Sequence, residues 1–139
     1  MIRLLTIVLA VCAAAGPARA QLTLVDEGQA RAVIVVPNDQ HGATRLPAAR
    51  LTGEGVTVAL AAVELADYLE RATGVRLGIV SDLIPAPADR ARIFVGPCRG
   101  APLPEGPEAL RPEEILLRVE GNSLVIAGGD RTPEGLRTS

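Results

Sequence analysis

The stretch from Val56 to Gly74, VTVALAAVELADYLERATG, constrains the fold of this chain more than any other. Its apolar residues recur at the i, i+3, i+4, i+7 spacing that places side chains on one face of an α-helix. These residues are Val58, Ala61, Ala62, Leu65, Tyr68, Leu69 and Ala72. We predict a helix over Val56–Thr73, ending at Gly74 because glycine readily adopts the left-handed conformation found at helix C-termini.

The apolar segments that flank this helix are short and typical of strands. We predict a hairpin over Leu22 to Val36 with its turn at Asp26 to Gln29, and single strands over Arg76–Val80 and Ala91–Val95. A second hairpin joins Glu114–Glu120 to Ser123–Ala127 through Gly121-Asn122, and its alternating pattern predicts that one face is exposed to solvent. The chain is therefore expected to form an α+β domain in which a sheet packs against one main helix.

The first twenty residues have the features of a secretory signal peptide. Arg3 supplies a positive start, Leu4 to Ala15 is apolar, and Ala18-Arg19-Ala20 fits the small-x-small cleavage pattern. The apolar run is shorter than the ~20 residues that a membrane-spanning helix needs. Cys12 follows Val11, a poor match to a lipoprotein site, so we interpret it as an ordinary residue of the signal. We expect cleavage after Ala20 and a secreted or periplasmic bacterial protein with no membrane attachment afterwards.

Composition excludes several classes of function. Without Arg3 and Arg19, 12 of the 14 basic residues remain against 16 acidic ones, which gives a net charge of −4 and argues against a nucleic-acid partner. Tyr68 and Phe94 are the only aromatic residues, and both lie in segments predicted to be core. Aromatic rings are the usual platforms for sugars, so carbohydrate binding by this domain alone is not expected.

The candidate catalytic residues favour structural explanations. Cys98 has no neighbouring base and is expected to be a small buried residue. His41 has only Asp39 close to it as a further metal ligand, which favours a solvated loop histidine over a metal site. The carboxylates Glu64, Asp67 and Glu70 share one helix face, the ordinary charged surface of an amphipathic helix, and Glu113-Glu114 is interpreted in the same way. We predict no catalytic, cofactor-binding or metal-binding residue and no cofactor.

Three motifs in this order resemble a known domain. The helix contains A-x-E-L-x-x-Y-L-E-x-x-T-G, a later strand ends in I-x-V-G-P, and the last hairpin ends in I-A-G-G-D. The arrangement resembles the N-terminal domain of α-glucuronidases of glycoside hydrolase family 67, and a similar domain precedes the barrel in β-hexosaminidases. The matching residues are Ala62, Glu64, Leu65, Tyr68, Leu69, Glu70, Thr73, Gly74, Ile93, Val95, Gly96, Pro97, Ile126, Ala127, Gly128, Gly129 and Asp130.

This resemblance implies a fold and a role. The fold is an α+β sandwich with a mostly antiparallel sheet, over residues 21–130. The role is that of a non-catalytic accessory domain of a secreted, xylan-degrading glycoside hydrolase, whose partner is the catalytic (β/α) barrel of the same parent protein. Gly96, Gly128, Gly129 and Asp130 are the residues expected at the barrel-docking interface.

The sequence departs from the family pattern at its end. The helix that leads into the barrel in relatives is not found in 131–139, which we interpret as a truncated linker toward a missing barrel. No catalytic residue of the family maps onto this chain. Without that helix and the barrel, the sheet of this chain is expected to keep uncovered apolar surface. The alternative is a free-standing periplasmic module that binds carbohydrate or another protein. The sugar linkage and the oligomeric state are not indicated by the sequence.

Overall fold

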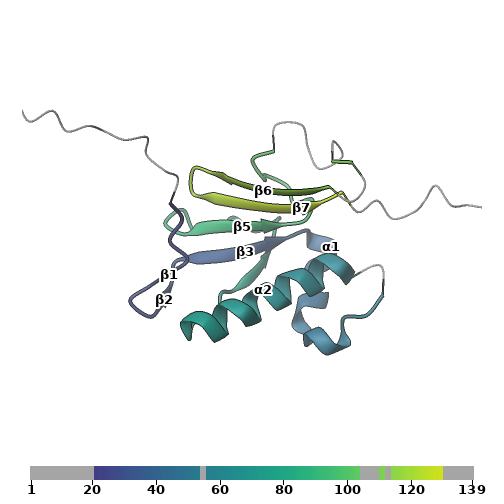
Figure 1. The fold of residues 1–139 in the computed structure, drawn as a ribbon, viewed down its shortest axis with the longest axis horizontal. Helices are drawn as coiled ribbons and strands as arrows, with labels where there is room; N and C mark the ends of the chain where they lie inside the picture. The colour runs from purple at the N-terminus through teal and green to yellow at the C-terminus, as the bar shows by residue number, and fades with distance from the viewer. Residues whose placement is uncertain (1–20, 54–55, 104–109, 112–113, 130–139) are drawn as a thin grey trace, which may run out of the picture.

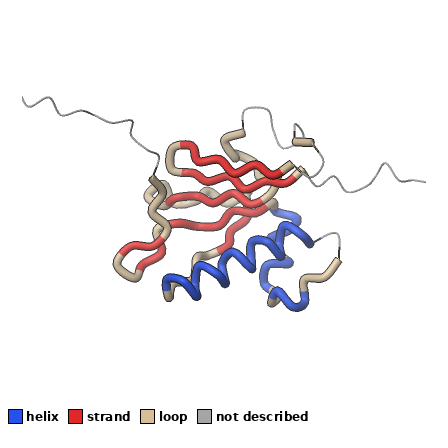
Figure 2. The backbone as a smooth tube through the Cα atoms, in the orientation of Figure 1, coloured by secondary structure: helices blue, strands red, loops and turns tan. Residues whose placement is uncertain are grey.

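The computed structural model describes residues 21–53, 56–103, 110–111 and 114–129. Within this part, five strands form one sheet in the order β4-β3-β5-β7-β6, and a small separate hairpin pairs β1 with β2. The main helix, α2 (Thr57–Thr73), lies on this sheet (Figures 1 and 2). The sheet strands are β3 (Ala32–Val36), β4 (Ile79–Ser81), β5 (Ala91–Val95), β6 (Ile115–Glu120) and β7 (Ser123–Gly128). The mixed α+β content built on one main helix is thus confirmed.

The sheet is mostly parallel, so the expected mostly antiparallel sheet is wrong. Strand β3 pairs in parallel with both β4 and β5, and β5 pairs in parallel with β7. The antiparallel pair in this sheet is β6 with β7. The physical reason is that β3 is buried on both faces along its whole length, and the main helix connects it to β4 as a βαβ unit, which requires parallel strands.

The predicted first hairpin is also corrected. The hairpin is the short one between β1 (Val25–Asp26) and β2 (Gln29–Ala30), while β3 belongs to the main sheet. Its two turn residues, Glu27 and Gly28, have φ values of 47° and 72°. Positive φ at both positions is the geometry of a type I′ turn, whose twist suits two antiparallel strands.

Helix α2 (Thr57–Thr73) begins one residue later than predicted and ends as expected. Gly74 has a φ of 74° and donates its N–H to the carbonyl oxygen of Glu70, which closes the last turn. The strand predicted over Arg76–Val80 is shorter and forms β4. Short helical segments lie between β3 and α2, namely α1 (Asn38–His41), η1 (Ala43–Arg45) and η2 (Ala48–Arg50).

The core has two sides because the central strands β3 and β5 are covered on both faces. On one face, Ala62 and Ala66 of α2 pack against alternate residues of the parallel strands; the buried cluster is Ala32, Ile34, Val36, Ala62, Ala66, Leu77, Ala91, Ile93 and Val95. The other face, around Val35, Phe94 and Val125, is covered by residues of the connecting loops such as Ala86 and Leu103. Helix α2 therefore covers the part of its face formed by β4, β3 and β5.

Candidate functional site

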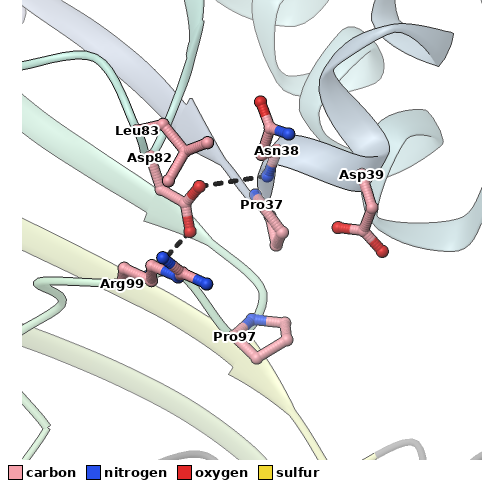
Figure 3. Close-up of a pocket in the computed structure, with 7 residues that line it drawn as sticks. All are labelled: Pro37, Asn38, Asp39, Asp82, Leu83, Pro97 and Arg99. Carbon is pink, nitrogen blue, oxygen red and sulfur yellow. Dashed lines mark hydrogen bonds between the residues drawn. The ribbon is translucent and has the colours of Figure 1, made fainter.

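The ends of the parallel strands form a hollow with several polar residues on its wall. The loops that follow β3, β4 and β5 meet there, because parallel strands end at the same edge of a sheet. The hollow has a volume of about 350 Å³ (Figure 3). It is lined by Pro37, Asn38, Asp39, Asp82, Leu83, Pro97 and Arg99.

Asp82 ties these three loops together. Its Oδ1 accepts the backbone N–H of Asn38 at 3.0 Å, and its Oδ2 accepts the backbone N–H of Arg99 at 2.8 Å. Its own N–H donates to the carbonyl oxygen of Val36 at the end of β3. Beside it, the Ser81 hydroxyl donates to the side-chain oxygen of Asn38 at 2.9 Å. These polar groups are engaged in holding the strand ends together, which is a structural role.

Among the described residues, those that line the hollow are not the partners that nucleophilic catalysis needs. They include no serine, threonine, cysteine, histidine or lysine. Asp39 and Asp82 are the carboxylates on its wall, and both oxygens of Asp82 already accept backbone N–H groups. The hollow could hold a small polar molecule by hydrogen bonds to Asn38, Asp39 and Arg99.

The sequence-predicted docking residues collect at the same edge of the sheet. Gly96 follows β5, Gly128 is the last residue of β7, and Gly129 follows it; β7 is the strand that pairs with β5. The N–H of Gly96 donates to the carbonyl oxygen of Ile126 at 2.9 Å, which extends this pairing. Asp130, the fourth predicted residue, lies outside the described residues, as do the signal segment 1–20 and the segment 131–139.

Two of these glycines have reasons to be glycine within the domain itself. Gly96 has a φ of 79°, and a Cβ there would lie 2.9 Å from both methyl groups of Val58 in α2. A Cβ on Gly129 would collide with the carbonyl oxygen of Arg111. These contacts explain both glycines without a docking partner, so the docking role of Gly96 and Gly129 stays a prediction.

The carboxylates of α2 form a surface ion-pair group. Nη1 of Arg76 lies 2.6 Å from Asp67 Oδ1 and 2.8 Å from Glu70 Oε2, and all three side chains are partly exposed. These hydrogen bonds, first to Asp67 and then to Glu70, raise the pKa of Arg76 above its ordinary value. Glu64 is exposed on the same helix. The arrangement is a solvated charged face, without the enclosed pair of carboxylates that acid–base catalysis requires.

Cys98 is buried, as expected, with 7% of its surface exposed. Its thiol lies 3.2 Å from the carbonyl oxygen of Val35 and 3.3 Å from that of Val95. Burial, with a smaller contribution from the negative charge of Asp82, raises the pKa of this thiol to about 12. The thiolate that reactivity requires is therefore suppressed at neutral pH.

His41 lies at the end of the short helix α1 rather than in a fully solvated loop. Its Nε2 is 3.3 Å from the carbonyl oxygen of Ile79 in β4, so the ring links α1 to the sheet. Within the described residues no group of three His, Cys, Asp or Glu side chains could hold a metal ion. No helix in that part of the chain is long and apolar enough to cross a membrane.

An apolar surface lies over β6 and β7. The sequence predicted that one face of this hairpin is exposed, but not that the exposed face is apolar. Ile115, Leu117 and Val119 of β6 are 79%, 70% and 42% exposed. Leu117 pairs with Ile126 and Val119 with Leu124, and these two β7 residues lie on the face that α2 covers further along the sheet. We call these five residues the β6–β7 surface. The exposed face of the predicted hairpin is thus its apolar face, while Leu116 and Arg118 on the opposite face are partly buried.

Comparison with known proteins identifies no relative: no family model matches the chain, and no curated protein and no solved structure matches it. The resemblance to the α-glucuronidase N-terminal domain therefore stays a prediction made from the motifs.

Proposed function

We propose that this chain is the non-catalytic N-terminal accessory domain of a secreted, α-glucuronidase-like glycoside hydrolase that acts on xylan-type polysaccharide. In this role the domain packs against the catalytic barrel of its parent protein and stabilises it. The proposal combines the motif resemblance with a physical property of the described domain, namely that part of its packing surface is uncovered.

The observation that carries the proposal is the exposure of the β6–β7 surface. Isolated apolar side chains on a protein surface are ordinary, but a contiguous apolar patch marks an interaction site. Here three large apolar side chains of one strand are exposed in a row, beside two partly buried ones. Each ~100 Å² of such surface contributes about 2.5 kcal/mol when it is buried, before the costs of association.

The patch borders the residues predicted to dock the barrel. Ile115, its most exposed member, pairs directly with Gly128. Gly128 ends β7 and Gly129 follows it, at the point from which the chain would continue toward a barrel. The uncovered surface and the expected docking edge are therefore adjacent, which is the arrangement that an accessory domain needs.

The hollow at the ends of the parallel strands favours the second candidate, a free-standing carbohydrate-binding module. Ligands of open parallel sheets bind at this edge, and Asn38, Asp39 and Arg99 could bond to sugar hydroxyl or carboxylate groups. Against it, the lining contains no aromatic side chain on which a sugar ring could stack.

Calorimetric titration of the mature chain separates the two. We expect no heat of binding with glucuronic acid or with glucuronic-acid-substituted xylo-oligosaccharides, and no release of sugar from these compounds. The gene region downstream of the Ser139 codon should encode a (β/α) barrel. Saturable sugar binding would favour the free-standing module, and hydrolysis by the mature chain would exclude the accessory role.

A further inference from the structure

Strand β6 has one unpaired edge within the described part of the chain. It is the last strand in the sheet order β4-β3-β5-β7-β6, so β7 is its neighbour on one side (Figure 1). Backbone hydrogen bonds alternate in direction along an antiparallel pair, and the N–H of Gly129 donates to the carbonyl oxygen of Glu114 at 2.7 Å. Counting from Glu114, every second residue of β6 therefore bonds to β7. These residues are Leu116, Arg118 and Glu120.

The residues between them turn their backbone groups outward. The N–H and C=O groups of Ile115, Leu117 and Val119 point away from β7, and no backbone group of the described residues bonds to them. We call these groups the open edge of β6. The same residues carry the exposed side chains of the β6–β7 surface. Unpaired hydrogen-bonding groups and uncovered apolar surface thus lie together.

This row differs from the other exposed apolar side chains of the described domain. Tyr68 is 65% exposed on α2, so the expectation that it belongs to the core is wrong. Leu46, Leu83 and Ile84 are exposed in loops. None of these four residues lies in a strand, so none combines apolar surface with the free backbone groups of a sheet edge.

The sequence of β6 does not contain the features that usually keep a strand edge single. β6 has six residues that pair with β7 without a bulge, and it contains no proline and no lysine. Its charged residues, Arg118 and Glu120, lie 2.9 Å apart in an ion pair on the face opposite the β6–β7 surface. The other edge strand, β4, has three residues. A long, regular edge with apolar side chains is a template for pairing with another strand.

We infer that β6 of a second copy of the chain pairs with this edge in antiparallel orientation, so that two five-stranded sheets form one continuous sheet. A twofold axis at Leu117 places Leu117 opposite Leu117 of the second copy, and Ile115 opposite its Val119. Every N–H and C=O of the open edge is then bonded across the interface. The opposed side chains are Leu with Leu and Ile with Val, and such apolar cross-strand pairs stabilise a sheet.

Other positions of the axis are less favourable. An axis at Arg118 places the two Arg118 side chains directly opposite each other, and like charges there destabilise the pair. An axis at Val119 places Leu117 opposite Gly121 in the turn and leaves Ile115 beyond the end of β6 in the second copy. An axis between two residues sets outward backbone groups against inward ones. The register centred on Leu117 therefore uses the open edge most fully.

The charged residues are compatible with this register. Glu120 comes opposite Glu114 of the second copy at the two ends of the pairing, but each carboxylate has an arginine in its own chain. Oε2 of Glu120 lies 2.9 Å from Nη2 of Arg118, and Oε2 of Glu114 lies 3.6 Å from Nε of Arg111. These ion pairs offset the repulsion between the two carboxylates.

A second copy fits this edge better than the proposed barrel does. A (β/α) barrel closes its strands into a ring and has no free edge to pair with β6. The inference goes beyond the proposed function, which uses the side chains of the β6–β7 surface rather than the backbone of the open edge. Pairing along one strand buries less than the ~1,200 Å² of a standard interface, so we expect a weak dimer with a Kd of about 0.1 mM.

Sedimentation velocity of the mature chain between about 10 μM and about 1 mM tests the association. We expect a monomer at the low concentration and a dimer at the high one. Because Leu117 faces itself across the axis, Leu117→Lys and Leu117→Glu should each weaken the dimer by about tenfold or more through like charges. An equimolar mixture of the two variants should associate again, since a lysine then lies opposite a glutamate.

Two further variants separate pairing at the edge from packing of apolar faces. Val119→Pro keeps an apolar side chain and removes an N–H that does not bond to β7, so the domain should fold and the dimer should weaken by about tenfold. Face-to-face packing of two β6–β7 surfaces would tolerate this change. Leu83→Lys is the matched control for Leu117→Lys, because Leu83 is 53% exposed but lines the hollow after β4. It should dimerise as the parent does.

Single cysteine substitutions read the register. Residues of a hydrogen-bonded antiparallel pair have Cα atoms about 5.5 Å apart, within the range that a disulfide spans. Under mild oxidation, Leu117→Cys should form a disulfide between two copies, whereas Arg118→Cys and Val119→Cys should not. Cys98 is buried and does not compete.

The inference is overturned by a monomer at about 1 mM protein, or by a dimer that Leu117→Lys or Val119→Pro leaves unchanged. It is also overturned if the mixture of Leu117→Lys with Leu117→Glu stays monomeric, or if the disulfide forms faster at Arg118→Cys or Val119→Cys than at Leu117→Cys. The proposed function fails separately: sugar hydrolysis by the mature chain would exclude the accessory role and would not change the dimer.

Discussion

Asp82 shows how a single carboxylate can hold an open sheet edge together. The loops after β3 and β5 each donate a backbone N–H to one of its oxygens, so one side chain fixes three strand ends. Hydrogen bonds to a charged acceptor contribute more than neutral ones, typically about 1.5–3 kcal/mol. The Asp82 carboxylate is therefore expected to contribute to stability even though it is partly exposed.

We predict that Asp82→Ala lowers the free energy of unfolding by about 1–3 kcal/mol, because two backbone N–H groups lose their acceptor. Asp82→Asn keeps one acceptor oxygen and should lose about half as much. Urea denaturation measures both, and Asp89→Ala, an exposed carboxylate in the same loop, serves as the control. An unchanged midpoint for Asp82→Ala would show that water replaces the carboxylate without cost.

Cys98 makes a pH-dependent contribution whose direction follows from its raised pKa. In the unfolded chain the thiol loses its proton near pH 8.5, whereas in the folded protein it keeps it up to about pH 12. The contribution of the Cys98 thiol to the free energy of unfolding is fully present below pH ~8.5. It falls by up to ~1.4 kcal/mol per pH unit between the two pKa values. We predict that the stability of the parent chain falls relative to Cys98→Ala between about pH 8.5 and 10.5. A constant difference over that range would contradict the burial of the thiol.

At the level of secondary-structure elements, the sequence predicted helix α2, strand β5 and the β6–β7 hairpin closely. Helical periodicity, Gly74 and the Gly121-Asn122 turn are local signals, and local signals determine where elements begin and end. Strand pairing is not local. The pairing of β3 with β4 and β5 depends on tertiary packing, although the continuous apolar run Ala32–Val36 before a helix could have indicated a buried parallel strand.

The candidate site, like the strand pairing, could be predicted from the sequence only in part. The motif endings brought Gly96, Gly128 and Gly129 to attention, and the parallel pairing places them at one edge. Asp82 carried no motif, because its importance comes from two loops distant in sequence. The exposure of Ile115, Leu117 and Val119 could not be read from alternation, since alternation assigns residues to two faces without saying which face is covered.

Gly96 tests the contact between β5 and α2. We predict that Gly96→Ala lowers the free energy of unfolding by about 1–3 kcal/mol, because an L-residue is strained at positive φ and its methyl group would press on Val58. Gly78→Ala is the control: Gly78 does not have positive φ, and no atom lies within 4 Å of a Cβ built there. Thermal unfolding followed by circular dichroism compares the two. Equal melting temperatures would mean that α2 can shift away from the end of β5.

For the whole molecule, the distribution of covered and uncovered apolar surface predicts how stable the domain is and which side chains contribute to that stability. The largest fully buried side chains are Ile34, Leu77, Ile93, Val36 and Val125, and much of the remaining core is alanine. The β6–β7 surface contributes little while it is exposed. We therefore expect the mature chain to melt below ~65 °C, within the ordinary range for a mesophilic domain.

A pair of large-to-small substitutions distinguishes a buried from an uncovered side chain within the same sheet. Ile93, 1% exposed, lies under α2, so Ile93→Ala should cost about 2–5 kcal/mol through lost burial and the cavity left behind. Leu117, 70% exposed, loses a similar number of atoms in Leu117→Ala, but they are already in water, so the cost should stay within about 0.5 kcal/mol. Urea denaturation of both variants at two protein concentrations gives the comparison. If Leu117→Ala costs as much as Ile93→Ala, the β6–β7 surface is already covered in the isolated chain. A cost that changes with protein concentration would show that a second copy of the chain covers it.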